Sequence, residues 1–81
     1  MPKAIVDPDD LQPRVELVRL YERAGRKLDA AAEQVKLGGI QAERGDTEGA
    51  LESFERAAVL APENLDILEK ILGLHESRGE A

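Results

Sequence analysis

The sequence contains no cysteine and no tryptophan, and its 81 residues include one tyrosine, one phenylalanine and one histidine. Without cysteine, the chain has no disulfide framework, no cysteine-ligated zinc site and no cysteine nucleophile. With Tyr21 and Phe54 as its only aromatic residues, it also lacks a surface for stacking nucleic-acid bases. We therefore expect a core of alanine, leucine, valine and isoleucine.

Long apolar runs are also missing. No segment approaches the roughly 18 apolar residues of a membrane span, and residues 1–6 are too short and too polar for a secretory signal. We therefore expect a soluble, cytoplasmic protein that has no membrane partner. Because no strand pattern, low-complexity tract or linker divides the chain, its length predicts one small domain.

Clustered positive charge, which nucleic-acid binding requires, is sparse as well. The formal net charge is −6. The densest basic cluster lies between residues 19 and 27, and Glu22 interrupts it. This cluster is typical of a solvated helix face and turn, so we expect no nucleic-acid partner.

Apolar residues spaced three and four apart predict four helices, at about residues 11–24, 27–44, 47–60 and 65–78. Residues 1–8 lack this periodicity and are predicted to form a flexible arm, followed by a helical domain over residues 9–81. The residues predicted to face inward are Leu11, Val15, Val18, Leu20 and Tyr21 in the first helix, and Leu28, Ala31, Val35, Gly38 and Ala42 in the second.

The connection between the second and third predicted helices carries a turn signature. We expect Gly45 to end one helix as a left-handed cap and Asp46 to cap the start of the next. Pro62 then ends the third helix. Gly49 lies inside that helix, so replacing it with alanine is expected to be neutral or stabilising.

Two glycines interrupt the second predicted helix. Gly38 and Gly39 each cost about 1 kcal/mol relative to alanine, which predicts that a neighbouring helix approaches closely there. We expect Leu51 and Phe54 of the third helix to fill the space between the helices.

Taken in order, these residues resemble a tetratricopeptide repeat. The 34-residue unit of that family has a Leu-Gly pair in its first helix, a turn glycine, Ala and Phe four residues apart in its second helix, and a closing Pro. The aromatic positions of the first helix are not matched. The resemblance implies an all-α, right-handed solenoid of stacked antiparallel helix pairs; an unrelated helical hairpin with a Gly-Asp turn is the alternative. The matching residues are Leu37, Gly38, Gly45, Asp46, Ala50, Phe54, Ala57 and Pro62.

An internal repeat supports a stacked arrangement. A shift of 54 positions places Pro8, Leu11, Leu20, Glu22 and Gly25 on Pro62, Leu65, Leu74, Glu76 and Gly79. Several of these are cap and turn residues. The intervals between turn glycines are unequal, so residues 27–44 are predicted to serve as the second helix of one pair and the first of the next.

The family resemblance also implies a site for a protein or peptide partner. Ligands of the family bind along the groove that successive helix pairs leave open. The Lys and Asn residues with which some members clamp a chaperone tail are missing here, so we expect another partner. Transferred by position, the groove residues are Val15, Arg19, Glu22 and Arg23, together with Val35, Gly39, Ala42 and Glu43.

The fourth predicted helix supports a second hypothesis, self-association or docking to a larger repeat protein. Its apolar stripe would be covered by a following helix, which the sequence does not contain. We expect this stripe to be an exposed interface, either of a natural end that pairs with another copy or of a fragment of a longer array. Its residues are Leu65, Leu68, Ile71, Leu72 and His75.

A catalytic role is not expected. Ser53 and His75 lie a helix apart, and no Gly-x-Ser-x-Gly motif surrounds Ser53. His75 forms no recognisable metal-binding spacing with Asp66 or Glu69. The sequence therefore predicts no enzyme, no metal site and no cofactor.

Overall fold

The computed structural model describes residues 10–77 and residue 79, and this part of the chain is helical without any strand. The all-α class and the four predicted helices are therefore confirmed, each within about two residues of its predicted bounds. The predicted arm over residues 1–8 lies outside the described residues. The helices are α1 (Gln12–Arg23), α2 (Lys27–Glu43), α3 (Thr47–Leu60) and α4 (Leu65–Ser77).

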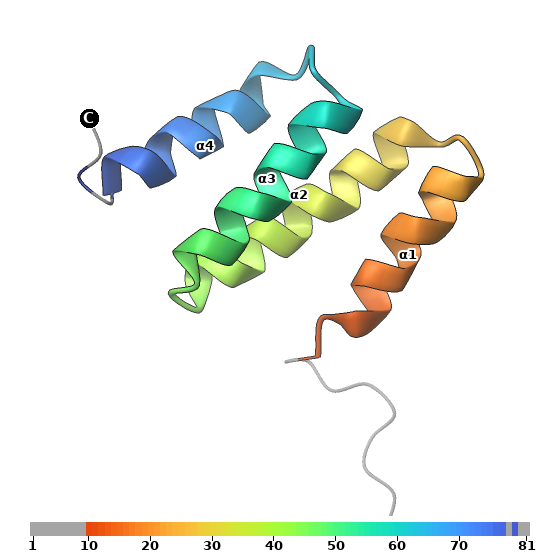
Figure 1. Ribbon diagram of the computed structural model, residues 1–81, viewed down its shortest axis with the longest axis horizontal. Coiled ribbons are helices and arrows are strands. Elements are labelled where there is room, and N and C mark those ends of the chain that lie inside the picture. Colours follow the sequence, from red (N-terminus) through yellow and green to blue (C-terminus); the bar gives the residue numbers. More distant parts are fainter. Residues whose placement is uncertain (1–9, 78, 80–81) are drawn as a thin grey trace, which may run out of the picture.

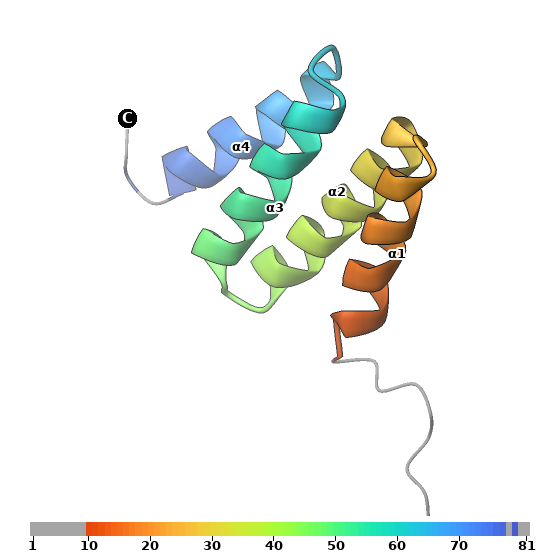
Figure 2. The ribbon, with the colours of Figure 1, turned by 45° about the vertical axis from the view of Figure 1, so that its right-hand side comes forward.

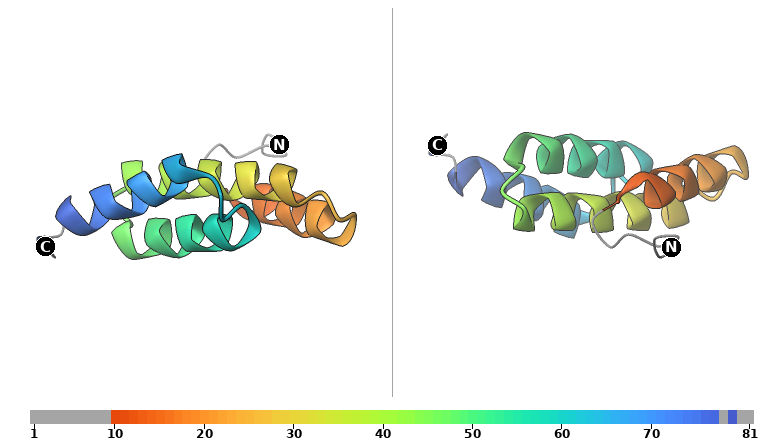
Figure 3. Two further views of the ribbon diagram at one scale, coloured as in Figure 1. Left: turned by 90° about the horizontal axis from the view of Figure 1, so that it is seen from above. Right: turned by 90° about the horizontal axis from the view of Figure 1, so that it is seen from below.

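The helices pack in chain order, with α2 against both α1 and α3, and α3 against α4 (Figures 1 and 2). Seen from above, α2 and α4 lie on one side of the molecule and α1 and α3 on the other (Figure 3). The result is a two-layer stack of adjacent helix pairs. As predicted, α2 takes part in two pairs.

Glycine caps end the first two helices in the same way. Gly25 and Gly45 have φ of +77° and +84°, a region that glycine enters without steric cost. In each turn the residue after the glycine donates its backbone N–H back into the helix, from Arg26 to the Tyr21 carbonyl and from Asp46 to the Gln41 carbonyl, both at 2.8 Å. The predicted cap at Gly45 is confirmed.

Asp46 caps α3, as predicted, because its Oδ1 accepts from the backbone N–H of Gly49 at 3.0 Å. The expectation that alanine is neutral or stabilising at Gly49 stays a prediction, and the structure shows an obstacle to it. A Cβ at this position would collide with the Asp46 carboxylate and would lie 2.9 Å from the Gln41 amide. The carboxylate would have to leave its capping position.

The larger core cluster joins α2, α3 and α4 around Phe54, which is buried, whereas Tyr21 is only half-buried. A Cβ on Gly38 would lie 2.5 to 2.8 Å from the Phe54 ring, so the close helix approach predicted there is confirmed. Gly39 has no such neighbour within 4 Å. The buried members are Ala31, Ala50, Phe54, Ala57, Ala61 and Ile67.

The smaller core cluster joins α1 to α2 through Val18, Ala30 and Leu37. Beside it, Arg14 Nη1 donates to Glu33 Oε1 at 3.0 Å, and the Glu33 side chain is only 10% exposed. This ion pair ties the two helices together at the edge of their apolar contact.

Three apolar residues lie on other faces than predicted. Leu20 and Leu28 were expected inside but are 59% and 74% exposed. For Leu20 the reason is that α1 packs chiefly on α2 and buries the face that contains Val18. In α4 the buried residue is Ile67, which the predicted stripe omitted. Ile71 packs against the same core cluster, since α4 turns this face toward α3.

Candidate functional site

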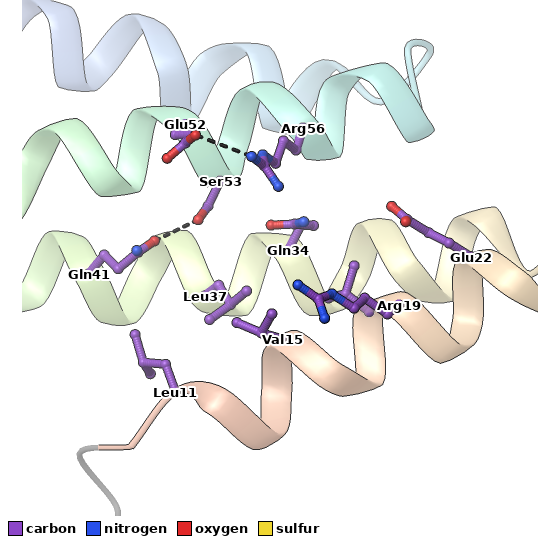
Figure 4. Close-up of a pocket in the computed structure, with 11 residues that line it drawn as sticks. Leu11, Val15, Arg19, Glu22, Gln34, Leu37, Gln41, Glu52, Ser53 and Arg56 are labelled. Atoms are coloured by element: carbon purple, nitrogen blue, oxygen red, sulfur yellow. Dashed lines mark hydrogen bonds and ion pairs between the residues drawn. The ribbon is translucent and has the colours of Figure 1, made fainter.

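A groove of about 330 Å³ runs between α1 and α3, with α2 beneath it (Figure 4). It forms because α1 and α3 both pack on α2 from the same layer of the stack and leave a space between them. The lining residues are Leu11, Val15, Val18, Arg19 and Glu22 from the α1 segment, Gln34, Leu37 and Gln41 from α2, and Glu52, Ser53 and Arg56 from α3.

The floor of the groove is held by side-chain amide and hydroxyl groups. Ser53 is buried, and its hydroxyl lies 2.6 Å from the Gln41 amide. In the amide orientation that satisfies both groups, the Gln41 nitrogen lies within hydrogen-bond distance of the Ser53 hydroxyl and of the Leu37 and Gly49 carbonyls, at 3.2 and 3.1 Å for the carbonyls, and its two N–H groups are shared among these acceptors. The contacts with Ser53 and Gly49 connect α2 to α3.

One end of the groove is apolar. Leu11, Val15 and Leu37 line this end, and the guanidinium of Arg19 lies beside Val15 and Leu37 (Figure 4). Leu37 is buried and Val15 half-buried, so the packing of α1 on α2 already covers most of this surface. What remains open can contact an apolar side chain of a ligand.

Beyond the apolar end, arginines reach into the groove from its two walls. Arg19 extends from α1 toward α2, and Arg56 from α3 points toward Gln34 (Figure 4). Arg56 pairs with Glu52 at 3.2 Å and Arg19 with Glu16 at 3.7 Å, and all four side chains are more than half exposed. Such pairs contribute about 0–1 kcal/mol, so either guanidinium can turn to a ligand carboxylate at little cost.

The predicted groove residues fall into separate places. Val15, Arg19 and Glu22 line the groove, whereas Arg23 is exposed on α1 outside it. Val35 and Ala42 pack against the core cluster around Phe54. Of the remaining two, Gly39 is half-buried and Glu43 is exposed. The structure thus does not bring the α1 and α2 sets together, because α1 shares a layer with α3 rather than with α2.

The predicted end interface on α4 is only partly open. Leu65, Leu68 and Leu72 are exposed, whereas Ile71 is half-buried against the core cluster and His75 is half-buried. None of these residues lines the groove.

Sequence reasoning missed the α2 and α3 sides of the groove, in particular Gln34, Gln41, Ser53 and Arg56. A signal was present, because Gln34 and Gln41 lie seven residues apart on the face of α2 that otherwise carries buried apolar residues. Polar residues at such a spacing on a buried face indicate a wet or functional surface. The sequence predicted that α2 pairs with both neighbouring helices, but it did not show which α2 residues border the space between α1 and α3.

The structure also shows where the residues considered for catalysis or metal binding lie. The Ser53 hydroxyl is bonded to the Gln41 amide, and His75 lies on α4, outside the groove lining. Over residues 10–77 and 79, His, Asp and Glu side chains form no group of three or more that could hold a metal ion. Within the same residues, no helix combines the length and apolarity needed to cross a membrane.

Comparisons of the chain with protein-family models, with curated proteins and with solved structures gave no match.

Proposed function

We propose that this chain is a protein-interaction module that binds a peptide segment of a partner protein in the groove between α1, α2 and α3. The observation that carries the proposal is the groove's composition: an apolar end beside two arginines from opposite walls, each held only by an exposed ion pair. A site of this kind recognises an apolar side chain and a negatively charged group of the same ligand.

The groove favours a ligand with an apolar side chain next to a carboxylate. The apolar side chain would contact Val15 and Leu37, and the carboxylate would receive hydrogen bonds from Arg19 or Arg56. Because Glu22 and Glu52 also line the groove and the chain carries a net charge of −6, a strongly acidic segment would be repelled. A segment with one carboxylate and a basic flank fits these charges best.

The tetratricopeptide-like sequence pattern also supports a binding role. Gly38 and Phe54, two of the residues that carry this pattern, make a close contact between α2 and α3. Stacked helix pairs expose extended grooves, which serve as peptide-binding surfaces. The groove proposed here lies on the α1 and α3 side, rather than along the α2 residues that the family pattern implied.

A displayed library of random peptides, screened on the immobilised chain, tests the proposal. We expect selected peptides to share an apolar residue near an Asp or Glu, and to shift the amide resonances of Val15, Leu37 and Ser53 in the labelled protein. Arg19→Gln should weaken binding about tenfold, since a hydrogen bond to a charged group contributes about 1.5–3 kcal/mol.

Arg23→Gln is the matched control, because it removes the same charge from the same helix outside the groove. Equal affinity of the parent, Arg19→Gln and Arg23→Gln for a selected peptide would overturn the proposal. So would resonance shifts confined to α4, or a screen that enriches no peptide.

A further inference from the structure

The two end helices of the stack expose apolar stripes. On α4, Leu65, Leu68 and Leu72 are 68%, 45% and 58% exposed. Their spacing of three and four residues places them in one line along the helix. This line differs from the face of α4 that carries Ile67, which is buried in the core.

The second stripe lies on α1, on a different face from the groove. Pro13, Leu17, Leu20 and Ala24 follow one another at intervals of four, three and four residues, which again makes one line along the helix. All are exposed except Leu17, which is half-buried. The α1 residues of the groove are Leu11, Val15, Val18, Arg19 and Glu22, so none of the stripe is used by the groove.

The two ends carry opposite charge. Residues 12–27 have a formal charge of +3 and residues 63–77 one of −3. In the first segment, however, Arg19 and Glu22 line the groove, and Arg14 and Arg26 are paired with Glu33 and Asp29. Beside the α4 stripe, Glu69 and Glu76 are exposed. Beside the α1 stripe, Arg23 is exposed, together with Glu16, which pairs with Arg19. Because α1 and α4 lie at opposite ends of the stack, these surfaces cannot meet within one molecule (Figure 1).

We infer that copies of this chain associate head to tail, with the leucine stripe of α4 in one copy packing on the α1 stripe of the next. Each contact buries apolar side chains at its centre and places acidic residues opposite basic ones at its rim. A symmetric pair through α4 would instead bring Glu69 and Glu76 of both copies together. Since the two surfaces of a head-to-tail contact differ, association continues beyond two copies unless the rotation closes a ring.

This inference does not depend on the proposed peptide groove, and the two are tested separately. Each surface is blocked by one exposed substitution: Leu20→Glu on α1 and Leu72→Glu on α4. Both place a carboxylate in the apolar stripe, and the two blocked surfaces repel each other. Val59→Glu is the matched control, because Val59 is 80% exposed on α3 and belongs to neither stripe.

Sedimentation velocity measures the association from about 10 μM to about 1 mM, the range expected for a small, transient interface. We expect the mean mass of the parent and of Val59→Glu to rise with concentration beyond two copies. The association should weaken in about 0.5 M salt, because salt screens the charged rim. Leu20→Glu and Leu72→Glu should each remain monomeric alone, yet an equimolar mixture of them should form pairs of chains and nothing larger.

The pairing in the mixture is the decisive result. Leu20→Glu keeps an intact α4 stripe and Leu72→Glu keeps an intact α1 stripe, so only the mixture contains both surfaces on different chains. Circular dichroism and urea unfolding of each variant establish that the helices are retained. A parent that stays monomeric to about 1 mM would overturn the inference. Self-association of Leu20→Glu without that of Leu72→Glu would overturn it in favour of symmetric pairing through α4, and a monomeric mixture would overturn it as well.

Discussion

At the scale of single residues, two adjacent glycines in α2 have opposite surroundings. A Cβ on Gly38 would lie 2.5 to 2.8 Å from the buried Phe54 ring, whereas a Cβ on Gly39 would meet nothing within 4 Å. Gly38 is required by packing. Gly39 lowers the stability of the helix without a packing reason in this chain.

We therefore expect alanine to have opposite effects at the two positions. Gly38→Ala should destabilise the fold on the order of 1 kcal/mol, because overpacking a core costs about 1–3 kcal/mol and exceeds the gain in helix propensity. Gly39→Ala should stabilise it by up to about 1 kcal/mol. Urea unfolding measures both free energies, and effects of the same sign would contradict the close contact between α2 and α3.

At the scale of elements, α1 depends on few interactions. It packs chiefly on α2, through Val18 and the ion pair between Arg14 and Glu33. An end helix with one neighbour opens more readily than a helix packed on both sides. The attachment of α1 therefore governs whether the groove, which needs α1 as a wall, is present.

We expect Glu33→Ala to destabilise the protein by about 1 kcal/mol, because it leaves the part-buried Arg14 without its partner and also removes the weaker pair with Lys36 at 3.4 Å. Hydrogen exchange of the α1 amides should rise more than that of the α3 amides. Glu52→Ala is the control: its pair with Arg56 is exposed on both sides, so its loss should change stability by about 0.5 kcal/mol or less. Equal destabilisation by the two substitutions would show that the Arg14 pair does not hold α1.

At the scale of the whole molecule, Phe54 connects three of the four helices. Its ring contacts the Gly38 region of α2, and its cluster includes Ile67 of α4. Few other large side chains are buried among the described residues: half of the buried hydrophobic residues are alanines, and the others besides Phe54 are Val18, Leu37, Leu51 and Ile67. The cooperative unfolding of the chain should therefore depend on this side chain.

Phe54→Ala should lose about 3–5 kcal/mol, a large part of the stability that a small domain possesses. We expect the cooperative thermal transition, followed by circular dichroism, to disappear or to move far below that of the parent. Val59→Ala, on the exposed side of the same helix, should melt close to the parent. A Phe54→Ala variant that melts like Val59→Ala would contradict the central position of Phe54.

What the sequence by itself determined is local. Helix ends follow from short-range chemistry, so the turn glycine Gly45, the cap Asp46 and the proline Pro62 were predicted at the positions where the structure has them. The close contact at Gly38 was predicted too, from the cost of a glycine inside a helix, although the same argument gave a wrong prediction for Gly39. The all-α class followed from the apolar periodicity of the four helices.

What only the tertiary structure decided is which face of each helix is buried and which helices border the groove. Periodicity marks an apolar stripe on a helix, but the neighbours decide which side is covered, so Leu20 and Leu28 are exposed and Ile67 is buried. Likewise, Arg19 and Arg56 come from helices that do not follow one another in the chain, and they face one groove only because α1 and α3 both pack on α2.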